Sequence, residues 1–265
     1  MSPNEPQVLD FLTSLFTAGE SYSGINSARS ALSTFLANEK GTTIGNFPSV
    51  KRFLKGVFTL RPPIARYNNI WDVNIVLEYI RNFYPYEGMP LYLLTYKLVM
   101  LLALTSAQRV QTLHVLNIEE FVVEEEFIKI PIHDLLKQTS ARKYKFSIEL
   151  HRYQEDPSLC VVSSLREYLC RTRNLRGSEK YLLISFKKPY KRVTKQTISR
   201  WLKKVMFEAG IDIDKFKPHS TRAAAVSKAK QELVPVDEIL QVAGWSNETC
   251  FKRFYDKAII RDNIC

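Results

Sequence analysis

The sequence predicts a mainly α-helical protein with a small antiparallel β-sheet, divided between a helical N-terminal domain and a larger α+β domain. Apolar residues recur with helical spacing through the first 60 residues. Pro62 and Pro63 then end the last of these helices and favour an extended segment. Beyond them, helical spacing alternates with short runs of strand-type residues. We therefore expect domains at residues 1–61 and 70–265, joined by a linker at residues 62–69.

Three helices are expected in the N-terminal domain. The apolar face of the first consists of Leu9, Leu12, Leu15 and Phe16, and that of the second of Ile25, Ala28, Leu32, Phe35 and Leu36. Ser49 is expected to cap the third helix, because a serine oxygen there can accept from the unpaired amides of the first turn. The outer face of this helix presents Lys51, Arg52 and Lys55. These cations form either an ordinary solvated face or a surface for a polyanion.

The second domain is expected to combine helices with one small sheet. Helical spacing covers residues 73–83, 91–116, 161–169 and 198–206, and it returns from Arg222 onward. The runs FVV and FIKIPI predict a hairpin, and KYKFSIEL (residues 143–150) predicts a third strand. Gly210 and Gly244 are expected to end helices, since glycine readily adopts the left-handed conformation that follows a helix.

Composition restricts the kind of partner. The chain has 38 lysines and arginines against 27 aspartates and glutamates, which gives a formal net charge of +11 and a pI near 9.4. A charge this basic favours a nucleic acid or an anionic membrane. The most apolar stretch, residues 91–104, is too short to cross a membrane, so no membrane partner is expected.

Cysteine and histidine usage gives no sign of a metal site. The cysteines are Cys160, Cys170, Cys250 and Cys265, and they form no CxxC pair. The histidines His114, His133 and His151 are scattered. We therefore expect reduced thiols in an intracellular protein, with no metal and no cofactor.

Five short motifs carry residue types that suit phosphate chemistry: LTSAQRV, LLKQTS, KPHSTR, AGWSN and FKRFYDK. In chain order, the candidate catalytic residues are Arg109, Lys137, His219, Arg222, Trp245 and Tyr255. Arg109 and Arg222 can neutralise the non-bridging oxygens of a phosphodiester, because a guanidinium fork matches these oxygens and stays charged. A tyrosine can then attack the phosphorus and store the bond energy in a phosphotyrosine.

The leaving oxygen of such a reaction needs a proton, and a lysine is a suitable donor. Lys137 lies in the loop between two predicted strands, where its flexible stem could reach a scissile bond, while Lys143 and Lys145 are rivals on spacing alone. His219 and Arg222 stand three residues apart and so share one helix face or the first turn of a helix. This chemistry requires neither a metal ion nor a nucleotide.

These motifs resemble those of the tyrosine recombinase (phage integrase) superfamily, whose catalytic order is Arg, Lys, His-x-x-Arg, His or Trp, Tyr. LTSAQRVQTLHVL is similar to the first arginine motif, KPHSTRAAAV to the second, and AGWSN followed by RFYDK to the third. Lys137 in LLKQTS is similar to the lysine of the loop between strands two and three. The segments RPPIARYNNIWDVNIVLEYI and AGWSNETCFKRFY look most like the recombinases of DIRS-type retrotransposons of eukaryotes.

The resemblance covers the whole chain and implies a helical core-binding (SAM-like) DNA-binding domain followed by a catalytic domain. It also implies a clamp around double-stranded DNA, strand exchange through a Holliday junction by a homotetramer, nuclear location, and insertion of a mobile element into a chromosome.

Three positions depart from the family pattern. Thr112 stands where many members carry an acid that supports the first arginine. Tyr255 follows Trp245 by ten positions, one more than in many relatives, and Phe254 occupies the nine-residue position, so we expect a one-residue difference in helix register. Ten residues follow Tyr255, where relatives often send a longer helix into a neighbouring subunit.

DNA contacts are expected from cations on two predicted helices, namely Lys51, Arg52, Lys55, Lys195, Arg200, Lys203 and Lys204. Two alternatives to a recombinase stay open. A recombinase-derived module that only binds DNA would bind in a salt-sensitive way and form no covalent adduct. A type IB topoisomerase-like enzyme would relax plasmids that lack any target site.

Overall fold

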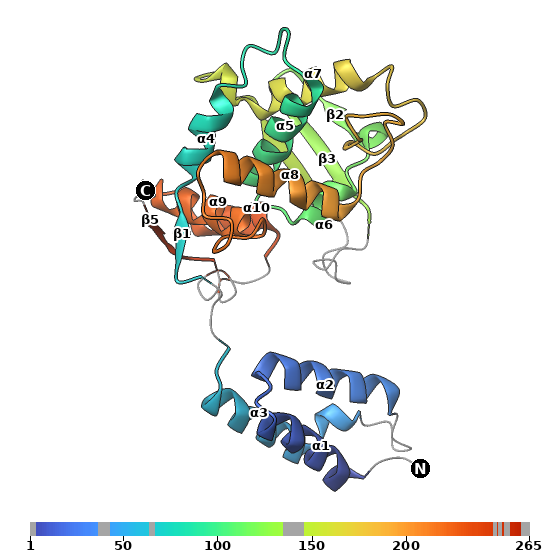
Figure 1. The fold of residues 1–265 in the computed structure, drawn as a ribbon, viewed down its shortest axis with the longest axis vertical. Coiled ribbons are helices and arrows are strands. Elements are labelled where there is room, and N and C mark those ends of the chain that lie inside the picture. Colours follow the sequence, from blue (N-terminus) through green and yellow to red (C-terminus); the bar gives the residue numbers. More distant parts are fainter. Residues whose placement is uncertain are drawn as a thin grey trace. The chain divides into compact units, whose positions relative to one another are not determined.

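The computed structural model describes residues 4–36, 43–63, 67–134, 146–245, 248, 251 and 255–260. The chain forms two compact units, Met1–Arg66 and Tyr67–Cys265, which Figure 1 shows in blue to turquoise and in turquoise to red. Each unit has its own hydrophobic core.

The first unit is a small helical domain. Its described elements are α1 (Glu5–Thr17), α2 (Tyr22–Phe35), the 3-10 helix η1 (Ile44–Asn46) and α3 (Pro48–Leu60). Asn4 and Gln7 form a capping box at the start of α1, in which each side chain accepts from the other residue's amide. The core of the unit consists of Val8, Leu12, Ile25, Ile44, Val50, Leu54 and Val57. The predicted helices of this domain are confirmed.

The start of α3 differs from the prediction. The helix begins at Pro48, no side chain caps it, and the hydroxyl of Ser49 donates to the carboxylate of Glu5 on α1. Proline suits the first helical position because it has no amide to satisfy and its φ is already helical. Ser49 therefore ties α3 to α1, and the prediction that it caps α3 was wrong.

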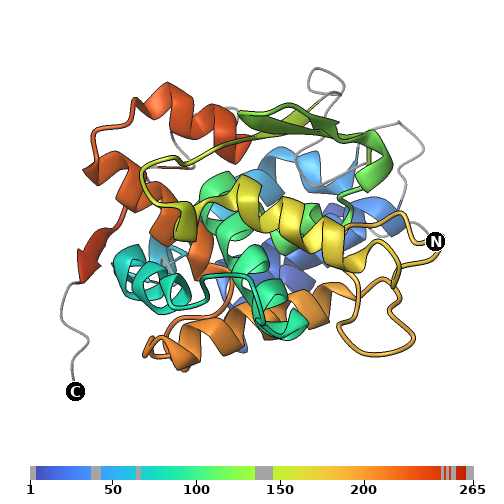
Figure 2. The same cartoon turned by 90° about the horizontal axis from the view of Figure 1, so that it is seen from above.

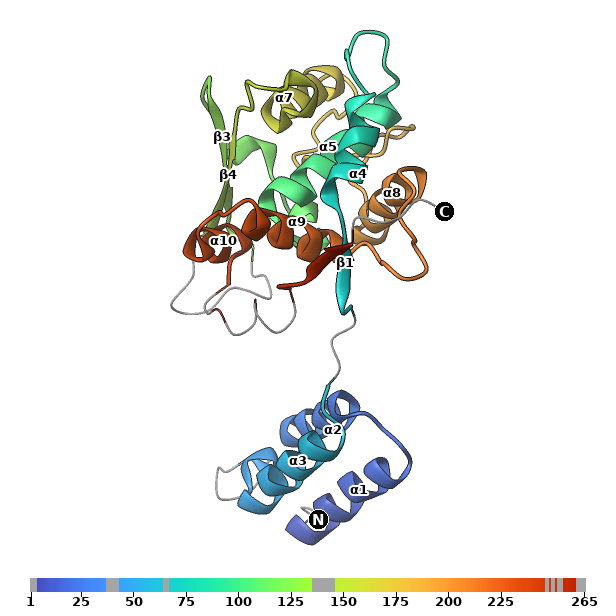
Figure 3. The ribbon, with the colours of Figure 1, turned by 90° about the vertical axis from the view of Figure 1, so that its left-hand side faces the viewer.

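The second unit is built around α5. Its helices are α4 (Val73–Arg81), α5 (Leu91–Ser106), α6 (Val110–His114), η2 (Ile118–Glu120), η3 (Pro157–Leu159), α7 (Val161–Thr172), α8 (Lys195–Glu208), α9 (Ser220–Gln231) and α10 (Val236–Ala243). Helix α5 packs against α7, α8, α9 and the sheet. Figures 2 and 3 show α5 between the sheet on one side and α8 on the other. Eleven of the 16 residues of α5 are buried, so it is a core helix of this unit.

The predicted three-stranded antiparallel sheet is confirmed. It has the order β2 (Val122–Val123), β3 (Phe127–Ile132), β4 (Phe146–His151), with Ile130 opposite Ile148. A second, two-stranded sheet was not predicted. In it, β1 (Asn69–Trp71) pairs in parallel with β5 (Ala258–Ile260), so the start of the second unit lies beside the segment that follows Tyr255.

The expected helical run at residues 91–116 is broken. Helix α5 ends at Ser106, Ala107 adopts a left-handed conformation (φ 49°, ψ 26°), and α6 begins only at Val110. A left-handed alanine is uncommon, and here the residue is buried against α9 and α10. The break places Arg109, which is half-buried, directly before the start of a new helix instead of inside a continuous one.

No helix in the described part of the chain has both the length and the apolar character that a membrane span needs. The same part contains no cluster of three or more His, Cys, Asp or Glu side chains that could hold a metal ion.

Candidate active site

Arg109 occupies the N-cap position of α6, with extended backbone (φ −77°, ψ 152°). Its side chain is half-buried, and its Nη1 is buried without a hydrogen-bond partner among the described residues. A buried guanidinium nitrogen normally has an acceptor. The unused donor therefore indicates that Arg109 is prepared to bind an anion.

Arg222 lies in the first turn of α9, three residues after the N-cap residue His219. Only 1% of Arg222 is exposed, and its Nη2 donates to the carbonyl of Ala243 over 2.7 Å. Its guanidinium carbon stands 4.4 Å from the ring centroid of Trp245. These contacts hold a permanently charged group in a fixed position at a helix N-terminus, where the peptide dipoles also favour an anion.

The C-terminal end of α10 is joined to both arginine motifs. Gly244 ends the helix in the left-handed conformation (φ 72°), as predicted, and Trp245 follows it, 8% exposed. The carbonyl of Ala243 accepts from Arg222, and that of Val242 accepts from Nε2 of Gln108 over 2.7 Å. Gln108 is the neighbour of Arg109, so the end of α10 has a fixed position relative to the two arginines.

Sequence reasoning did not identify Gln108. Its amide oxygen also accepts, over 3.4 Å, from the hydroxyl of Thr112, which stands in the position of the family's acid. No ion pair of Arg109 is present among the described residues. The only available signal was the position of Gln108 beside Arg109, because a bond to a carbonyl 134 residues away leaves no local pattern.

Tyr255 joins this group from the C-terminal segment. Its hydroxyl lies 3.4 Å from Nε2 of His219, and its ring centroid lies 4.6 Å from that of Trp245. The guanidinium carbon of Arg222 stands 5.5 Å from the Tyr255 ring. Four residues predicted from three separate motifs therefore meet in one place.

A cavity of about 220 Å³ opens between α6, α8 and α9. It is lined by Gln108, Arg109, Val110, Gln111, Ser199, Leu202, Pro218, His219, Thr221 and Arg222. Its volume is roughly seven times the ~30 Å³ of a water molecule in the liquid, enough for a phosphodiester group. Both arginines and His219 thus face one space of suitable size and charge.

Lys137 lies outside the described residues, as do its rivals Lys143 and Lys145, so the structure assigns no position to the predicted proton donor. Its role stays a prediction.

The cations predicted to contact DNA lie on α3 and α8. Lys51, Arg52, Lys55, Lys195, Arg200, Lys203 and Lys204 are all exposed. Lys204 is already neutralised, because its Nζ lies 2.6 Å from Oε1 of Glu208. The other cations on α8 are therefore better placed to meet a polyanion.

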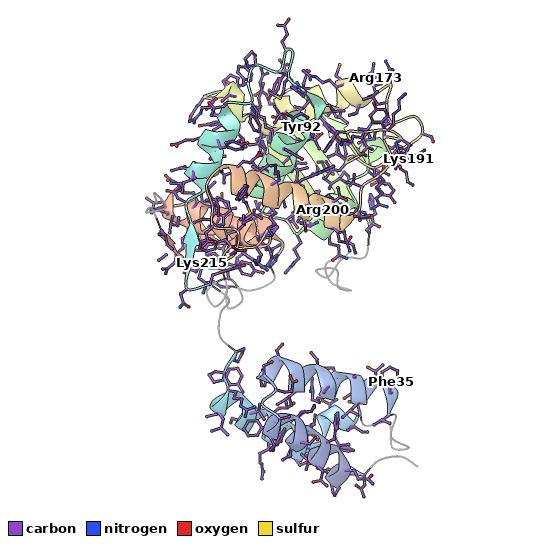
Figure 4. The ribbon with its side chains drawn as sticks, viewed as in Figure 1. Phe35, Tyr92, Arg173, Lys191, Arg200 and Lys215 are labelled. Carbon is purple, nitrogen blue, oxygen red and sulfur yellow. The ribbon has the colours of Figure 1, made fainter. Side chains whose placement is uncertain are left out.

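Sequence reasoning missed a second cationic cavity. It measures about 450 Å³ and is lined by Ser185, Phe186, Lys187, Pro189, Lys191, Arg192, Val193, Thr194, Thr197, Arg200 and Trp201. Figure 4 labels Lys191 on the loop that precedes α8 and Arg200 on α8 itself. The run KKPYKR was the available signal, since it concentrates cations immediately before that helix.

Comparisons with known proteins identify the family and the fold. The model of the phage integrase family matches residues 86–259. No curated protein has a matching sequence. Among solved structures, the chain is similar to the XerH site-specific recombinase bound to difH substrate (TM-score 0.59, 14% identity), covering 93% of this chain and 67% of XerH. The chain thus spans about two thirds of the length of XerH.

Two further structures have the same fold. The Tn1549 transposon integrase in complex with transposon right end DNA gives a TM-score of 0.61 at 17% identity, over 97% of this chain and 82% of that one. A lambda integrase tetramer bound to a Holliday junction gives 0.53 at 13% identity, over 99% and 68%.

Proposed function

Because the chain belongs to the phage integrase family, we propose that it is a site-specific recombinase that cleaves and rejoins DNA through a covalent 3′-phosphotyrosine. The observation that supports this most is the convergence of Arg109, His219 and Arg222 on one cavity, with the hydroxyl of Tyr255 3.4 Å from Nε2 of His219. Each residue type has a task in phosphoryl transfer, and none of these tasks needs a cofactor.

In the proposed reaction, a phosphodiester of double-stranded DNA enters the 220 Å³ cavity. Arg109 and Arg222 bind its two non-bridging oxygens and stabilise the charge that grows there in the transition state. The hydroxyl oxygen of Tyr255 bonds to phosphorus, its proton passes to Nε2 of His219, and the bond from phosphorus to the 5′ oxygen breaks. Rejoining is the reverse of these steps with a 5′ hydroxyl as the nucleophile.

The 5′ oxygen must gain a proton as it leaves, and we assign this task to Lys137. The assignment rests on the similarity of LLKQTS to the family motif. Trp245 packs against both Arg222 and Tyr255 and so helps to hold the clamp and the nucleophile together.

DNA binding is supported by the net charge of +11 and by the exposed cations of α3 and α8. The cationic cavity beside α8 adds to the cations of that helix, and its aromatic side chains Phe186 and Trp201 can pack against sugar or base. Binding through phosphates releases counterions and therefore weakens as salt rises.

We further propose that the enzyme inserts a mobile element, as a tetramer, in the nucleus. The element type rests on the likeness of residues 61–80 and 243–255 to recombinases of DIRS-type retrotransposons. The tetramer rests on the lambda integrase structure of the same fold. Repeats that flank the coding region in the source genome would support the first of these proposals.

The decisive experiment traps the covalent intermediate. The protein is incubated with a pool of nicked duplexes with a randomised central sequence, and protein-linked DNA is recovered under denaturing conditions. The wild-type chain should form an adduct and Tyr255→Phe should form none, because only the phenol can make the bond. An adduct of equal yield in Tyr255→Phe would overturn the assignment. DNA binding without any adduct would favour a recombinase-derived module that only binds DNA. Relaxation of supercoiled plasmids regardless of their sequence would favour a topoisomerase.

A further inference from the structure

The main chain on either side of Tyr255 is held by one buried side chain of α9. The hydroxyl of Ser227 donates to the carbonyl of Tyr255 over 2.7 Å and accepts from the amide of Lys257 over 3.2 Å. Only 4% of Ser227 is exposed. A single hydroxyl thus closes the turn around Asp256, with both of its bonds made to backbone.

Ser227 belongs to the same helix as the phosphate clamp. It lies five residues after Arg222, which is about one and a half turns, or roughly 7.5 Å along the axis. A helix is stiff over this length. Helix α9 carries both Arg222 and Ser227, and Ser227 binds the carbonyl of Tyr255. The helix therefore holds the backbone of Tyr255 at a fixed distance from Arg222.

Two further contacts hold the segment after Tyr255. Lys230 of α9 pairs with Asp256, and β5 pairs with β1 in the register Ala258 with Asn69. Figure 3 shows β5 beside β1, next to α9. The Lys230 side chain is 45% exposed, so its ion pair stabilises the segment only weakly. Ser227 is buried and makes two bonds, so it holds the segment more firmly than the ion pair does.

We propose that Ser227 is a positioning residue that holds the phenol of Tyr255 in line with the scissile phosphate. This inference rests on the proposed function, in which Tyr255 is the nucleophile. Without the hydroxyl, the carbonyl of Tyr255 and the amide of Lys257 lose their shared partner, and the turn between them can shift. A displacement of about 1 Å from the attack geometry can cost on the order of 100-fold in rate.

The test measures the first-order rate of adduct formation at saturating protein and, separately, the affinity for DNA. Ser227→Ala should lower that rate about 10- to 100-fold with DNA affinity unchanged. Alanine is the best helix former, so the variant should fold. Ser227→Thr, which keeps a hydroxyl, should recover most of the rate.

Ser164→Ala is the matched control. Ser164 is also a fully buried helical serine, but its hydroxyl bonds Cys160 and Tyr86, away from the C-terminal segment. Its loss should leave the rate unchanged. Equal rate losses in both variants would overturn the proposal, because they would indicate general destabilisation.

A second measurement follows DNA nicking that does not use the tyrosine as nucleophile. In Tyr255→Phe, hydrogen peroxide can replace the phenol: its anion bonds to phosphorus, the bond to the 5′ oxygen breaks, and that oxygen takes up a proton. Adding Ser227→Ala to Tyr255→Phe should leave peroxide-driven nicking unchanged, because the clamp of Arg109 and Arg222 stays intact. Slower nicking in the double variant would mean that Ser227 supports the clamp, which contradicts the proposal.

The outcomes also separate this inference from the proposed function. A wild-type adduct that depends on Tyr255 but forms at the same rate in Ser227→Ala would remove only the role of Ser227. The absence of any Tyr255-dependent adduct would remove both.

Discussion

The two arginines of the candidate site differ in what else they bind. Arg222 is buried, bonds the carbonyl of Ala243 and stacks on Trp245, so it supports the fold in addition to its proposed role in binding phosphate. Arg109 has a buried Nη1 with no acceptor among the described residues. Arg109 is therefore the better probe of chemistry, because its substitution disturbs fewer protein contacts.

Arg109→Ala should reduce cleavage far more than binding. The clamp acts mainly on charge that develops in the transition state, and loss of one such donor typically costs ~100- to 1,000-fold in rate. DNA affinity should fall less than about tenfold, since many other cations contact phosphates. Single-turnover adduct formation measures the cleavage rate, and a binding titration at fixed salt measures the DNA affinity.

Arg173→Ala is a suitable control, because Arg173 is an exposed arginine that follows α7 (Figure 4). It should leave the cleavage rate unchanged. Equal losses of rate and affinity in Arg109→Ala would argue that Arg109 is a simple phosphate-binding residue.

Trp245 allows a graded test. Trp245→His should keep more cleavage activity than Trp245→Ala, because a planar ring with an N–H can still pack against Arg222 and Tyr255. The measurement is again the adduct rate, with thermal melting to exclude unfolding. Equal activity of the two variants would rule out this role.

At the scale of elements, the sequence predicts most helices and the three-stranded sheet, because their periodicity is local. It does not predict the break after Ser106, since LTSAQRV contains no glycine or proline and continues the helical pattern. Packing of Ala107 between α9 and α10 overrides the local preference. The pairing of β1 with β5 was missed because three-residue strands show no period.

The residues of the candidate site also fall into those that the sequence predicts and those that it does not. Its charged and aromatic residues stand in recognisable motifs, so Arg109, Arg222 and Tyr255 could be predicted. Gln108 and Ser227 act through bonds to distant backbone groups, and such bonds leave no trace in the order of residues. Only the fold reveals them.

Helix α5 also contains a buried cation. Lys97 is fully buried, its Nζ donates to the carbonyl of Phe83, and no carboxylate pairs with it among the described residues. The rings of Tyr84 and Tyr86 lie 5.8 and 5.4 Å from the Nζ. Burial lowers the pKa of Lys97 to about 8.

Lys97 should make stability rise with pH. Between pH 8 and the unfolded value near 10.4, the unfolded chain binds a proton that the folded chain has lost, so raising the pH favours the folded state. From pH 7 to 9.5 the gain in unfolding free energy should be about 2 kcal/mol. Urea unfolding at both pH values measures it. Lys97→Met should lack this rise in unfolding free energy. An equal rise in that variant would show that deprotonation of Lys97 is not its cause.

At the scale of the whole molecule, the proposed tetramer could draw the nucleophile of each active site from the same chain or from a neighbouring one. Ser227, Lys230 and β1 all bind the Tyr255 segment within the chain that carries Arg222. A nucleophile supplied to another subunit would have to give up these contacts. The geometry therefore favours attack by Tyr255 in the active site of its own chain.

Mixing two inactive variants tests this. Arg109→Ala keeps the nucleophile but lacks part of the clamp, and Tyr255→Phe keeps the clamp but lacks the nucleophile. If each chain must supply both, the mixture should form no more adduct than the sum of the separate variants. Wild type mixed with either variant should still form adduct, which controls for inhibition by mixing. Adduct carried by the Arg109→Ala chain, identified by a size tag, would show instead that the phenol attacks in a neighbouring subunit and that the contacts of Ser227 open on assembly.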